Sequence, residues 1–264
     1  MKKAHKHGIV KSFCKSVRKC TPDKLRMLSY RFGTFMAAGA DSQKRHFPDM
    51  RNTLQALSDH GFKPAYCVDV GAYKGEWTIM FKELFPLSRI MMIEPQQDKA
   101  RVLLSLCDSF AGEVVLESAL LGAQPDQEVV FYTMETGSSV LPELTDFPRK
   151  AVTLKTTTLD LLLANQGIAG VDFLKLDTQG YELEVLKGAP RALEQTQAVL
   201  TEVSVIPYNK GGPLIAEVIH FLDTRGFQVA DICSHMRRND NMLWQTDLLF
   251  VRRSSDLFKA LRLE

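Results

Sequence analysis

The chain has 264 residues, of which 45% are hydrophobic and 24% are charged, values typical of a globular protein. This length suits one well-buried domain with an appendage, and no apolar run reaches the roughly 18 residues of a membrane-spanning helix, so no transmembrane segment is expected. Five scattered cysteines, an odd number, favour free thiols in a reducing compartment, and we expect a cytoplasmic protein.

The charge is unevenly distributed along the chain. Residues 1–31 carry ten Lys or Arg and one acidic residue, a balance of +9, whereas the remainder carries −7. Such a basic arm is either a solvated helix or a contact for phosphate, an anionic membrane surface or the acidic body itself. Because the body is acidic and lacks interleaved aromatic and basic residues, we expect no nucleic-acid partner.

Two helices are predicted near the N-terminus. The first begins at Thr21, a capping residue followed by Pro22 at the first helical position. The second covers residues 48–60, where apolar residues recur at helical spacing until Gly61 ends the pattern. We expect residues 1–60 to form a basic arm and helical cap, and residues 61–264 to form the main domain.

From residue 63 onward, short β-rich runs alternate with helical stretches. Strands are expected at 65–70, 89–93, 114–120, 171–176, 198–205, 227–233 and 247–251, and helices at 75–84, 97–107, 181–186 and 213–225. This alternation predicts an α/β fold with a mostly parallel sheet covered on both faces. Two further strands, 129–133 and 152–157, interrupt the pattern after the third strand. Ligands of such sheets bind beyond the carboxyl ends of the strands, where the strand order reverses.

The first strand ends in a turn rich in small residues. Gly71, Ala72 and Gly75 allow a tight turn and let the backbone approach a ligand, while the next helix presents its N-terminus. The spacing G-x-x-x-G differs from the G-x-G-x-x-G of dinucleotide-binding proteins. A structural turn without a ligand is the alternative.

The second strand ends at Glu94, 23 residues after Gly71. This is about the interval at which an acid binds ribose hydroxyls in nucleotide-binding α/β units. The alternative is an acid that merely stabilises a helix N-terminus. Together the two strand ends indicate an adenosine-containing ligand.

The fourth main strand ends in a polar cluster, Asp177-Thr178-Gln179-Gly180, before another helix. Asp177 and Gln179 are expected to point into the cleft, and Glu182 to cap the helix or reach back to the loop. Helix capping alone is the alternative explanation of this cluster.

Three motifs, DVGAYKG, IEP and LKLDTQGYELEVLKGA, resemble successive signatures of the FkbM methyltransferase family, a branch of the class I S-adenosylmethionine-dependent fold. LSDHGFKP, TTLD and TDLLFV are also similar, so the resemblance covers roughly residues 54–251. It implies a Rossmann-like, mostly parallel seven-stranded sheet with an inserted β-hairpin, N-terminal helices and an antiparallel final strand.

The resemblance also implies a cofactor, S-adenosylmethionine, and residues that bind it. The methionine part is assigned to Asp69, Gly71, Ala72 and Gly75, the ribose to Glu94, the adenine to Ser118, and the reacting methyl group to Asp177. Family members often carry asparagine near Ser118, so Glu117-Ser118 is a departure from the pattern.

Candidate catalytic residues are Asp177, Gln179 and His235. A hydroxyl acceptor must lose a proton, which requires a general base or a metal. Asp177 is the positional candidate, and His235 is an alternative base because it is expected to open the loop between the last two strands, on the same edge of the sheet as Asp177. A solvated loop histidine is the other interpretation.

Contacts to the substrate are assigned to Ser138 in the inserted loop, Glu202 near the end of the fifth strand, and Tyr208 just beyond it. Oxygen atoms of Asp177, Gln179 and Glu202 could also bind magnesium, but no tight acidic cluster requires a metal, and no Cys/His spacing suggests zinc. We therefore assign no metal.

The function predicted is O-methylation of a hydroxyl group on a sugar, a glycan or another small molecule. Two alternatives remain: a nucleotide-dependent oxidoreductase, which the glycine spacing disfavours, and a non-catalytic module that binds an adenosyl cofactor. The partner expected is a small-molecule or glycan acceptor, and no oligomeric state is indicated.

Overall fold

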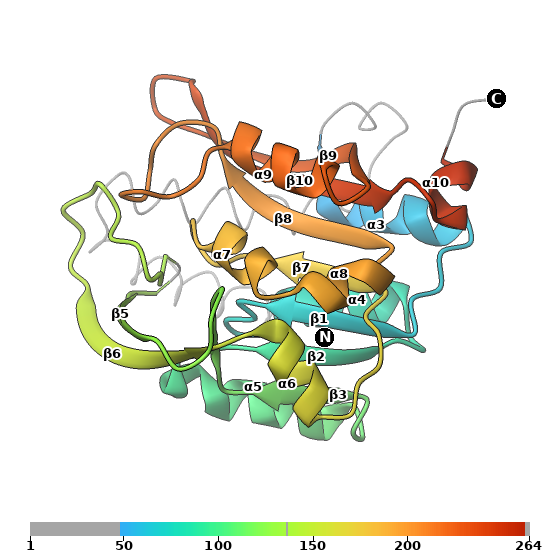
Figure 1. Cartoon of the computed structure of the whole chain (residues 1–264), viewed down its shortest axis with the longest axis horizontal. Coiled ribbons are helices and arrows are strands. Elements are labelled where there is room, and N and C mark those ends of the chain that lie inside the picture. The colour runs from blue at the N-terminus through green and yellow to red at the C-terminus, as the bar shows by residue number, and fades with distance from the viewer. Residues whose placement is uncertain (1–47, 136, 262–264) are drawn as a thin grey trace, which may run out of the picture. The chain divides into compact units, whose positions relative to one another are not determined.

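A computed structural model describes residues 48–135 and 137–261 of the protein (Figure 1). The expected basic arm and the helix expected to begin at Thr21 fall on residues 1–47, outside the described residues. None of the described helices has the length and apolar character needed to cross a membrane.

The core of the fold is a seven-stranded sheet with the order β3-β2-β1-β7-β8-β10-β9. Its strands are β1 (Tyr66–Val70), β2 (Arg89–Ile93), β3 (Val114–Glu117), β7 (Phe173–Leu176), β8 (Ala198–Ser204), β9 (Phe227–Arg237) and β10 (Leu243–Arg252). Neighbouring strands are parallel except for β10, which runs antiparallel to β8 and β9. The strand order reverses between β1 and β7, so this is the position where the rule for open α/β sheets places a ligand. The expected mostly parallel seven-stranded α/β fold is confirmed.

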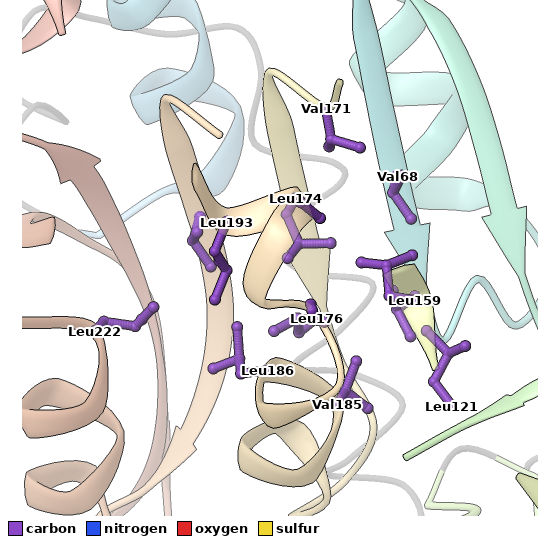
Figure 2. Close-up of a cluster of buried hydrophobic side chains, with 14 of the residues drawn as sticks. Val68, Leu121, Leu159, Val171, Leu174, Leu176, Val185, Leu186, Leu193 and Leu222 are labelled. Carbon is purple, nitrogen blue, oxygen red and sulfur yellow. The ribbon is translucent and has the colours of Figure 1, made fainter. Parts of the chain in front are cut away.

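Helices cover both faces of this sheet. Alternate residues of each strand point to opposite sides, and the strands present buried apolar side chains on both. The helices are α3 (Met50–Asp59), α4 (Glu76–Leu84), α5 (Gln97–Ser109), α6 (Leu159–Asn165), α7 (Glu182–Lys187), α8 (Pro190–Gln195), α9 (Ile215–Asp223) and α10 (Asp256–Ala260). One buried cluster joins the sheet to α6, α7, α8 and α9 (Figure 2), and a second joins its other face to α3, α4, α5 and α10.

Helix α3 confirms the helix expected at residues 48–60. Asp49 caps it by accepting a hydrogen bond from the backbone N–H of Asn52, at 2.8 Å. The helix packs against α4 and β9, and the Thr53 hydroxyl donates to the Asp231 carboxylate at 2.6 Å. It therefore lies in the compact unit Pro48–Glu264 together with the sheet.

Three short helices, α6, α8 and α10, were not expected from the sequence. Each has five to seven residues, which is too few for an apolar period to stand out. Side chains that accept from backbone N–H groups specify where α6 and α8 begin. Thr158 accepts from the backbone of Leu161 at the start of α6, and the Asp160 carboxylate accepts from the N–H groups of Arg191 and Ala192 in α8, at 2.8 and 2.9 Å.

The inserted strands form a separate sheet rather than a tight hairpin. Strands β5 (Glu128–Thr133) and β6 (Lys150–Thr157) are antiparallel, and β4 (Leu120–Leu121) pairs with β6 to give the order β4-β6-β5. The third main strand consequently ends at Glu117 and does not extend to residue 120. Residues 134–149 connect β5 to β6, and we refer to this segment, apart from residue 136, as the strap.

Candidate active site

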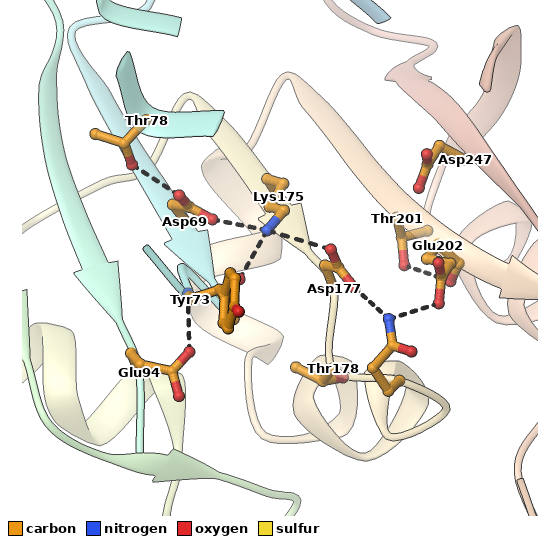
Figure 3. Close-up of polar contacts among 12 residues, drawn as sticks. Asp69, Tyr73, Thr78, Glu94, Lys175, Asp177, Thr178, Thr201, Glu202 and Asp247 are labelled. Atoms are coloured by element: carbon orange, nitrogen blue, oxygen red, sulfur yellow. Dashed lines mark hydrogen bonds and ion pairs between the residues drawn. The ribbon is translucent and has the colours of Figure 1, made fainter. Parts of the chain in front are cut away.

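Polar side chains from β1, β2, β7 and β8 gather at the carboxyl edge of the sheet, on both sides of the order reversal (Figure 3). The register places Asp69 of β1 directly beside Lys175 of β7. Both side chains point to the face covered by α4, because the residues two positions earlier, Cys67 and Phe173, lie in the core on that face. The site is therefore built around the junction of β1 and β7.

Lys175 and Asp69 form a buried ion pair at this junction. The Lys175 Nζ lies 2.9 Å from Asp69 Oδ1 and donates to the Gly71 carbonyl at 3.0 Å. Burial by itself lowers the pKa of Lys175, but the neighbouring carboxylates of Asp69 and Asp177 outweigh it and the pKa is raised. The Thr78 hydroxyl donates to the other Asp69 oxygen at 2.7 Å. The Asp69 carboxylate is thus held by the protein itself and fixes the turn after β1.

Glu94, at the end of β2, connects the turns that follow β1 and β2. Its Oε2 accepts from the Tyr73 N–H at 2.9 Å and its Oε1 from the Gln96 N–H at 3.0 Å. The side chain is buried, and burial raises its pKa although the two backbone hydrogen bonds oppose the shift. The Gln96 side chain also hydrogen-bonds to this carboxylate, which has about four acceptor positions in all.

Backbone conformation and close packing both require glycine at positions 71 and 75 of the turn. Gly71 and Gly75 have φ values of 76° and 82°, which disfavour other residues. A Cβ on Gly71 would lie 2.0 Å from the Asp177 carbonyl oxygen, and one on Gly75 would lie 2.4 Å from the Leu106 side chain. Ala72 is buried between them in the core. The turn therefore keeps the ends of β1 and β7 in contact.

Gln179 links two carboxylates beyond the ends of β7 and β8. Its Nε2 donates to Asp177 Oδ1 at 2.7 Å and to Glu202 Oε1 at 3.0 Å, and Gln245 donates to the same Glu202 oxygen at 2.8 Å. Gln179 and Glu202 are buried, whereas the Asp177 side chain is 30% exposed. Three residues expected in the site are thus brought together.

This bridge disfavours the magnesium site considered for the same residues. The amide N–H group of Gln179 points between Asp177 and Glu202, so it satisfies the carboxylates and presents no oxygen to a shared cation. Over residues 48–135 and 137–261, no group of three His, Cys, Asp or Glu side chains is arranged to hold a metal ion.

Glu182 reaches back to the loop after β7, one of the two roles expected for it. Its Oε1 accepts from the N–H groups of Thr178 and Gly180, at 2.8 and 3.1 Å. The side chain is fully buried, and burial raises its pKa. These bonds hold Gln179 at a φ of 55°, in the left-handed region. A strained backbone is thus maintained beside Asp177.

The strap crosses the ends of the strands on the same side of the sheet. Ser138 Oγ lies 3.0 Å from Gln96 Oε1, beyond β2, and Ser139 Oγ donates to the Gln179 carbonyl at 2.8 Å, beyond β7. Ser138, a predicted substrate contact, also accepts from the Met134 N–H at 2.9 Å within the strap.

The far end of the strap pairs with the loop after β8. Leu144 N–H donates to the Tyr208 carbonyl at 2.8 Å, and Glu143 forms an antiparallel bridge with Asn209. Tyr208 is half-buried, and burial together with the Glu143 carboxylate raises its pKa far above the ordinary value. Tyr208 is therefore a neutral hydroxyl group beside the Gln179 bridge and not a phenolate base.

Two of the predicted site residues lie away from this cluster. Ser118 is exposed just beyond β3, next to the strand that ends in Glu94. His235 was expected to open a loop but lies inside β9, where it pairs with Thr246. Strands β8 and β10 separate β9 from β7, a distance of roughly 14 Å at about 4.8 Å per strand. His235 and Asp177 are not brought together.

Sequence reasoning missed Lys175 and Glu143. A lysine inside the apolar run FLKL was a usable signal, because a charge in a strand covered on both faces must have a buried partner. Glu143 has no such signal, since it lies in an irregular segment whose path depends on tertiary contacts.

Solved structures with a similar arrangement of elements include several methyltransferases. Precorrin-6y C5,15-methyltransferase from Geobacter metallireducens is 13% identical, with a TM-score of 0.44 over 76% of this chain and 86% of the other. The 1,6-didemethyltoxoflavin-N1-methyltransferase from Burkholderia thailandensis, solved with its substrate and S-adenosylhomocysteine, is 14% identical, with a TM-score of 0.42 over 88% and 91%. An O-methyltransferase family protein from Burkholderia thailandensis is 14% identical, with a TM-score of 0.44 over 77% and 55%.

Comparison with curated protein sequences gives no significant match. The family model for the methyltransferase FkbM domain matches residues 69–229, which is more than half of the chain. The matched region begins at Asp69 and includes Glu94, the strap and Asp177. The chain therefore belongs to the FkbM methyltransferase family.

Proposed function

We propose that this methyltransferase transfers a methyl group from S-adenosylmethionine to a hydroxyl oxygen of a sugar, a glycan or another small molecule. The observation that carries the proposal is the buried Glu94 carboxylate. It lies at the end of β2, beside the reversal of strand order, and holds the turns after β1 and β2.

The proposed cofactor site follows from these contacts. Glu94 would accept the ribose hydroxyls, and the backbone at Gly71 and Ala72 would contact the methionine part. Gly75 and Asp69 would support the site by fixing the turn, since the Asp69 carboxylate is already bound by Lys175 and Thr78. Ser118, beyond the neighbouring strand, would lie on the adenine side.

S-adenosylmethionine, when bound, supplies an electrophilic methyl group. The residues of this chain must then orient the acceptor oxygen and receive its proton. Asp177 suits these tasks best, because its side chain is partly exposed and lies next to the end of β1. Gln179 would position the Asp177 carboxylate through their 2.7 Å hydrogen bond, and His235 is disfavoured as the base by its distance.

Calorimetry with S-adenosylmethionine and S-adenosylhomocysteine tests the cofactor site. Glu94→Ala should weaken binding of both at least tenfold, because it removes a charged acceptor. Asp177→Ala should change this affinity little and lower turnover. Glu128→Ala, an exposed acid at the start of β5, is the control. Equal loss of binding in the Glu94 and Asp177 variants would contradict the division of roles.

Labelled-methyl transfer tests the acceptor. Pairs of compounds that differ only in carrying a hydroxyl or an amine at one position should be methylated on the hydroxyl member. Labelling of the amine members alone would replace the O-methyltransferase assignment by N-methylation and leave the cofactor site intact.

A further inference from the structure

Gln179 is held in an unusual backbone conformation from several directions. Its φ of 55° lies in the left-handed region, where a residue with a side chain is strained. The Glu182 carboxylate accepts from the N–H groups of its two neighbours, Thr178 and Gly180. The Gln179 carbonyl accepts from the Ser139 hydroxyl of the strap at 2.8 Å. Strain of this kind persists only where the surroundings impose it, and it is typical of functional sites.

The side chain of Gln179 is fixed as well, and Glu202 determines which way it points. Gln179 Nε2 lies 3.0 Å from Glu202 Oε1, and Gln245 Nε2 lies 2.8 Å from the same oxygen. Because a carboxylate oxygen accepts hydrogen bonds, both amides turn their N–H groups toward it. The amide of Gln179 is thus oriented by β8 and β10, the strands that carry Glu202 and Gln245.

The oriented amide places a hydrogen-bond donor on Asp177. The same Gln179 nitrogen lies 2.7 Å from Asp177 Oδ1, and the other Asp177 oxygen lies 3.8 Å from Lys175 Nζ. In Figure 3 the dashed lines from Asp177 and Glu202 meet at one nitrogen atom. If the amide turned over, its carbonyl oxygen would face two carboxylates and both hydrogen bonds would be lost. Glu202 therefore acts on Asp177 through Gln179.

Burial gives the two carboxylates different surroundings. Glu202 is 6% exposed, and the two glutamines that donate to it, Gln179 and Gln245, are 8% and 2% exposed. The Asp177 side chain, in contrast, is 30% exposed. A molecule bound over the strand ends therefore meets Asp177 rather than Glu202. A buried network of satisfied hydrogen bonds is rigid, so Glu202 is suited to support its more exposed neighbour.

We propose that Glu202 is a positioning residue for methyl transfer and holds the Gln179 amide so that Asp177 meets the acceptor oxygen in one orientation. This role rests on the proposed function, in which Asp177 orients the acceptor and receives its proton. It replaces the substrate contact expected for Glu202 from the sequence. It also gives a role to Gln245, which the sequence did not single out.

The proposed role predicts an effect on rate and not on cofactor affinity. The acceptor oxygen forms a bond to the methyl carbon as the carbon–sulfur bond breaks, S-adenosylhomocysteine leaves, and the hydroxyl proton passes to Asp177. This displacement requires the oxygen to be aligned with the methyl group, and a misplacement of about 1 Å can cost about 100-fold in rate. An Asp177 carboxylate that turns freely would therefore lower kcat.

Two variants and a matched control test this role. Glu202→Met removes the acceptor for both amides at a similar side-chain length, and Glu202→Gln retains an oxygen that can accept from them. Gln197→Met is the control. The Gln197 amide also donates to a carboxylate, that of Asp172 at 3.1 Å, but it lies just before β8, at the opposite edge of the sheet.

The first measurement is hydrogen exchange of the side-chain amides, followed by NMR in protein labelled with nitrogen-15 glutamine. The Gln179 signals are identified by their loss in Gln179→Met. They should exchange with water about tenfold faster in Glu202→Met than in the parent, because a charged acceptor is lost. Glu202→Gln should stay within about threefold of the parent, and Gln197→Met should leave these signals unchanged.

The second measurement is transfer of a labelled methyl group from S-adenosylmethionine to the methyl glycosides of glucose, galactose and mannose. Glu202→Met should lower kcat about tenfold, while KM for S-adenosylmethionine changes by less than about twofold. Glu202→Gln should restore kcat to within about threefold of the parent, and Gln197→Met should match the parent. A merely structural role would not give this separation of kcat from KM, nor the recovery in Glu202→Gln.

The proposal is overturned if Gln179 exchanges equally fast in the parent and Glu202→Met, or if the two proteins have the same kcat. It is also overturned if Glu202→Gln loses as much activity as Glu202→Met. Melting temperatures identify unfolded variants. If Glu202→Met does not fold, Glu202→Asp takes its place, since it withdraws the carboxylate from Gln179 by one methylene group. If the parent methylates no glycoside, the proposed function fails, and amide exchange alone then decides for or against the role of Glu202.

Discussion

Replacing Lys175 by methionine should destabilise the protein strongly. The substitution keeps a long side chain in the β7 strand but leaves the Asp69 carboxylate, which is 0% exposed, without its cationic partner 2.9 Å away. Removing one member of a buried ion pair typically costs about 3–5 kcal/mol. For a domain of this size, that corresponds to a fall in Tm of roughly 6–20 °C.

The measurement is urea unfolding of the parent, Lys175→Met, Asp69→Asn and the double variant. The double variant should be more stable than Lys175→Met alone, because it no longer buries an uncompensated charge. Lys187→Met is the matched control. Lys187 pairs with Glu184 on the surface of α7, and its loss should cost about 1 kcal/mol or less.

The dependence on pH gives an independent check. The pKa of Lys175 is raised in the folded protein, so the ion pair stabilises fully at neutral pH and its contribution is lost as pH rises through that raised pKa. The parent and Lys175→Met should therefore differ less in their free energy of unfolding only in strongly alkaline solution. Two results would refute the role given to this pair. One is a fall of less than about 1 kcal/mol in the unfolding free energy of Lys175→Met at neutral pH, and the other is a double variant no more stable than Lys175→Met.

Three further variants test the loops around the site. Glu182→Gln keeps a side-chain oxygen that accepts from the two backbone N–H groups of the loop after β7. It removes the buried carboxyl group, whose pKa is raised. The parent should lose stability as pH rises through that pKa, and the variant should show a flatter pH profile of Tm. Gln179→Glu places a third carboxylate between Asp177 and Glu202, so its Tm should fall by several degrees at pH 8 and recover partly at pH 5. Asp160→Ala removes the acceptor for the first turn of α8 and should cost about 0.5–2 kcal/mol in urea unfolding without changing affinity for S-adenosylhomocysteine.

Much of the main sheet was predictable because its strands are buried on both faces. Continuous apolar runs such as 89–93 and 198–205 stand out from the helical stretches between them, and the observed strands differ little in their bounds. Strands β9 and β10 are both longer than the predicted 227–233 and 247–251, since they continue to pair with each other through more polar residues. The short helices α6 and α8 were missed because capping side chains, rather than an apolar period, specify them.

In the candidate site too, some residues were predictable from the sequence and others were not. Residues at strand ends, such as Glu94 and Asp177, were identifiable because the end of a buried strand in a parallel sheet fixes where a polar side chain lies. The partners of these residues were less accessible to sequence reasoning. The buried pairing of Lys175 depends on strand register, and the position of Glu143 depends on the path of the strap, which tertiary contacts determine.

The separation of the two sheets has a consequence for how this protein could be re-engineered. Among the described residues, β4, β5 and β6 share no hydrogen-bonded ladder with the seven-stranded sheet, and the strap meets that sheet only at loops beyond its strands. A segment with these attachments can be exchanged between homologous enzymes as one cassette. Exchange of residues 120–157, which include all three strands of the smaller sheet, would test whether this segment contributes to acceptor choice, while the main sheet with the proposed cofactor site stays unchanged.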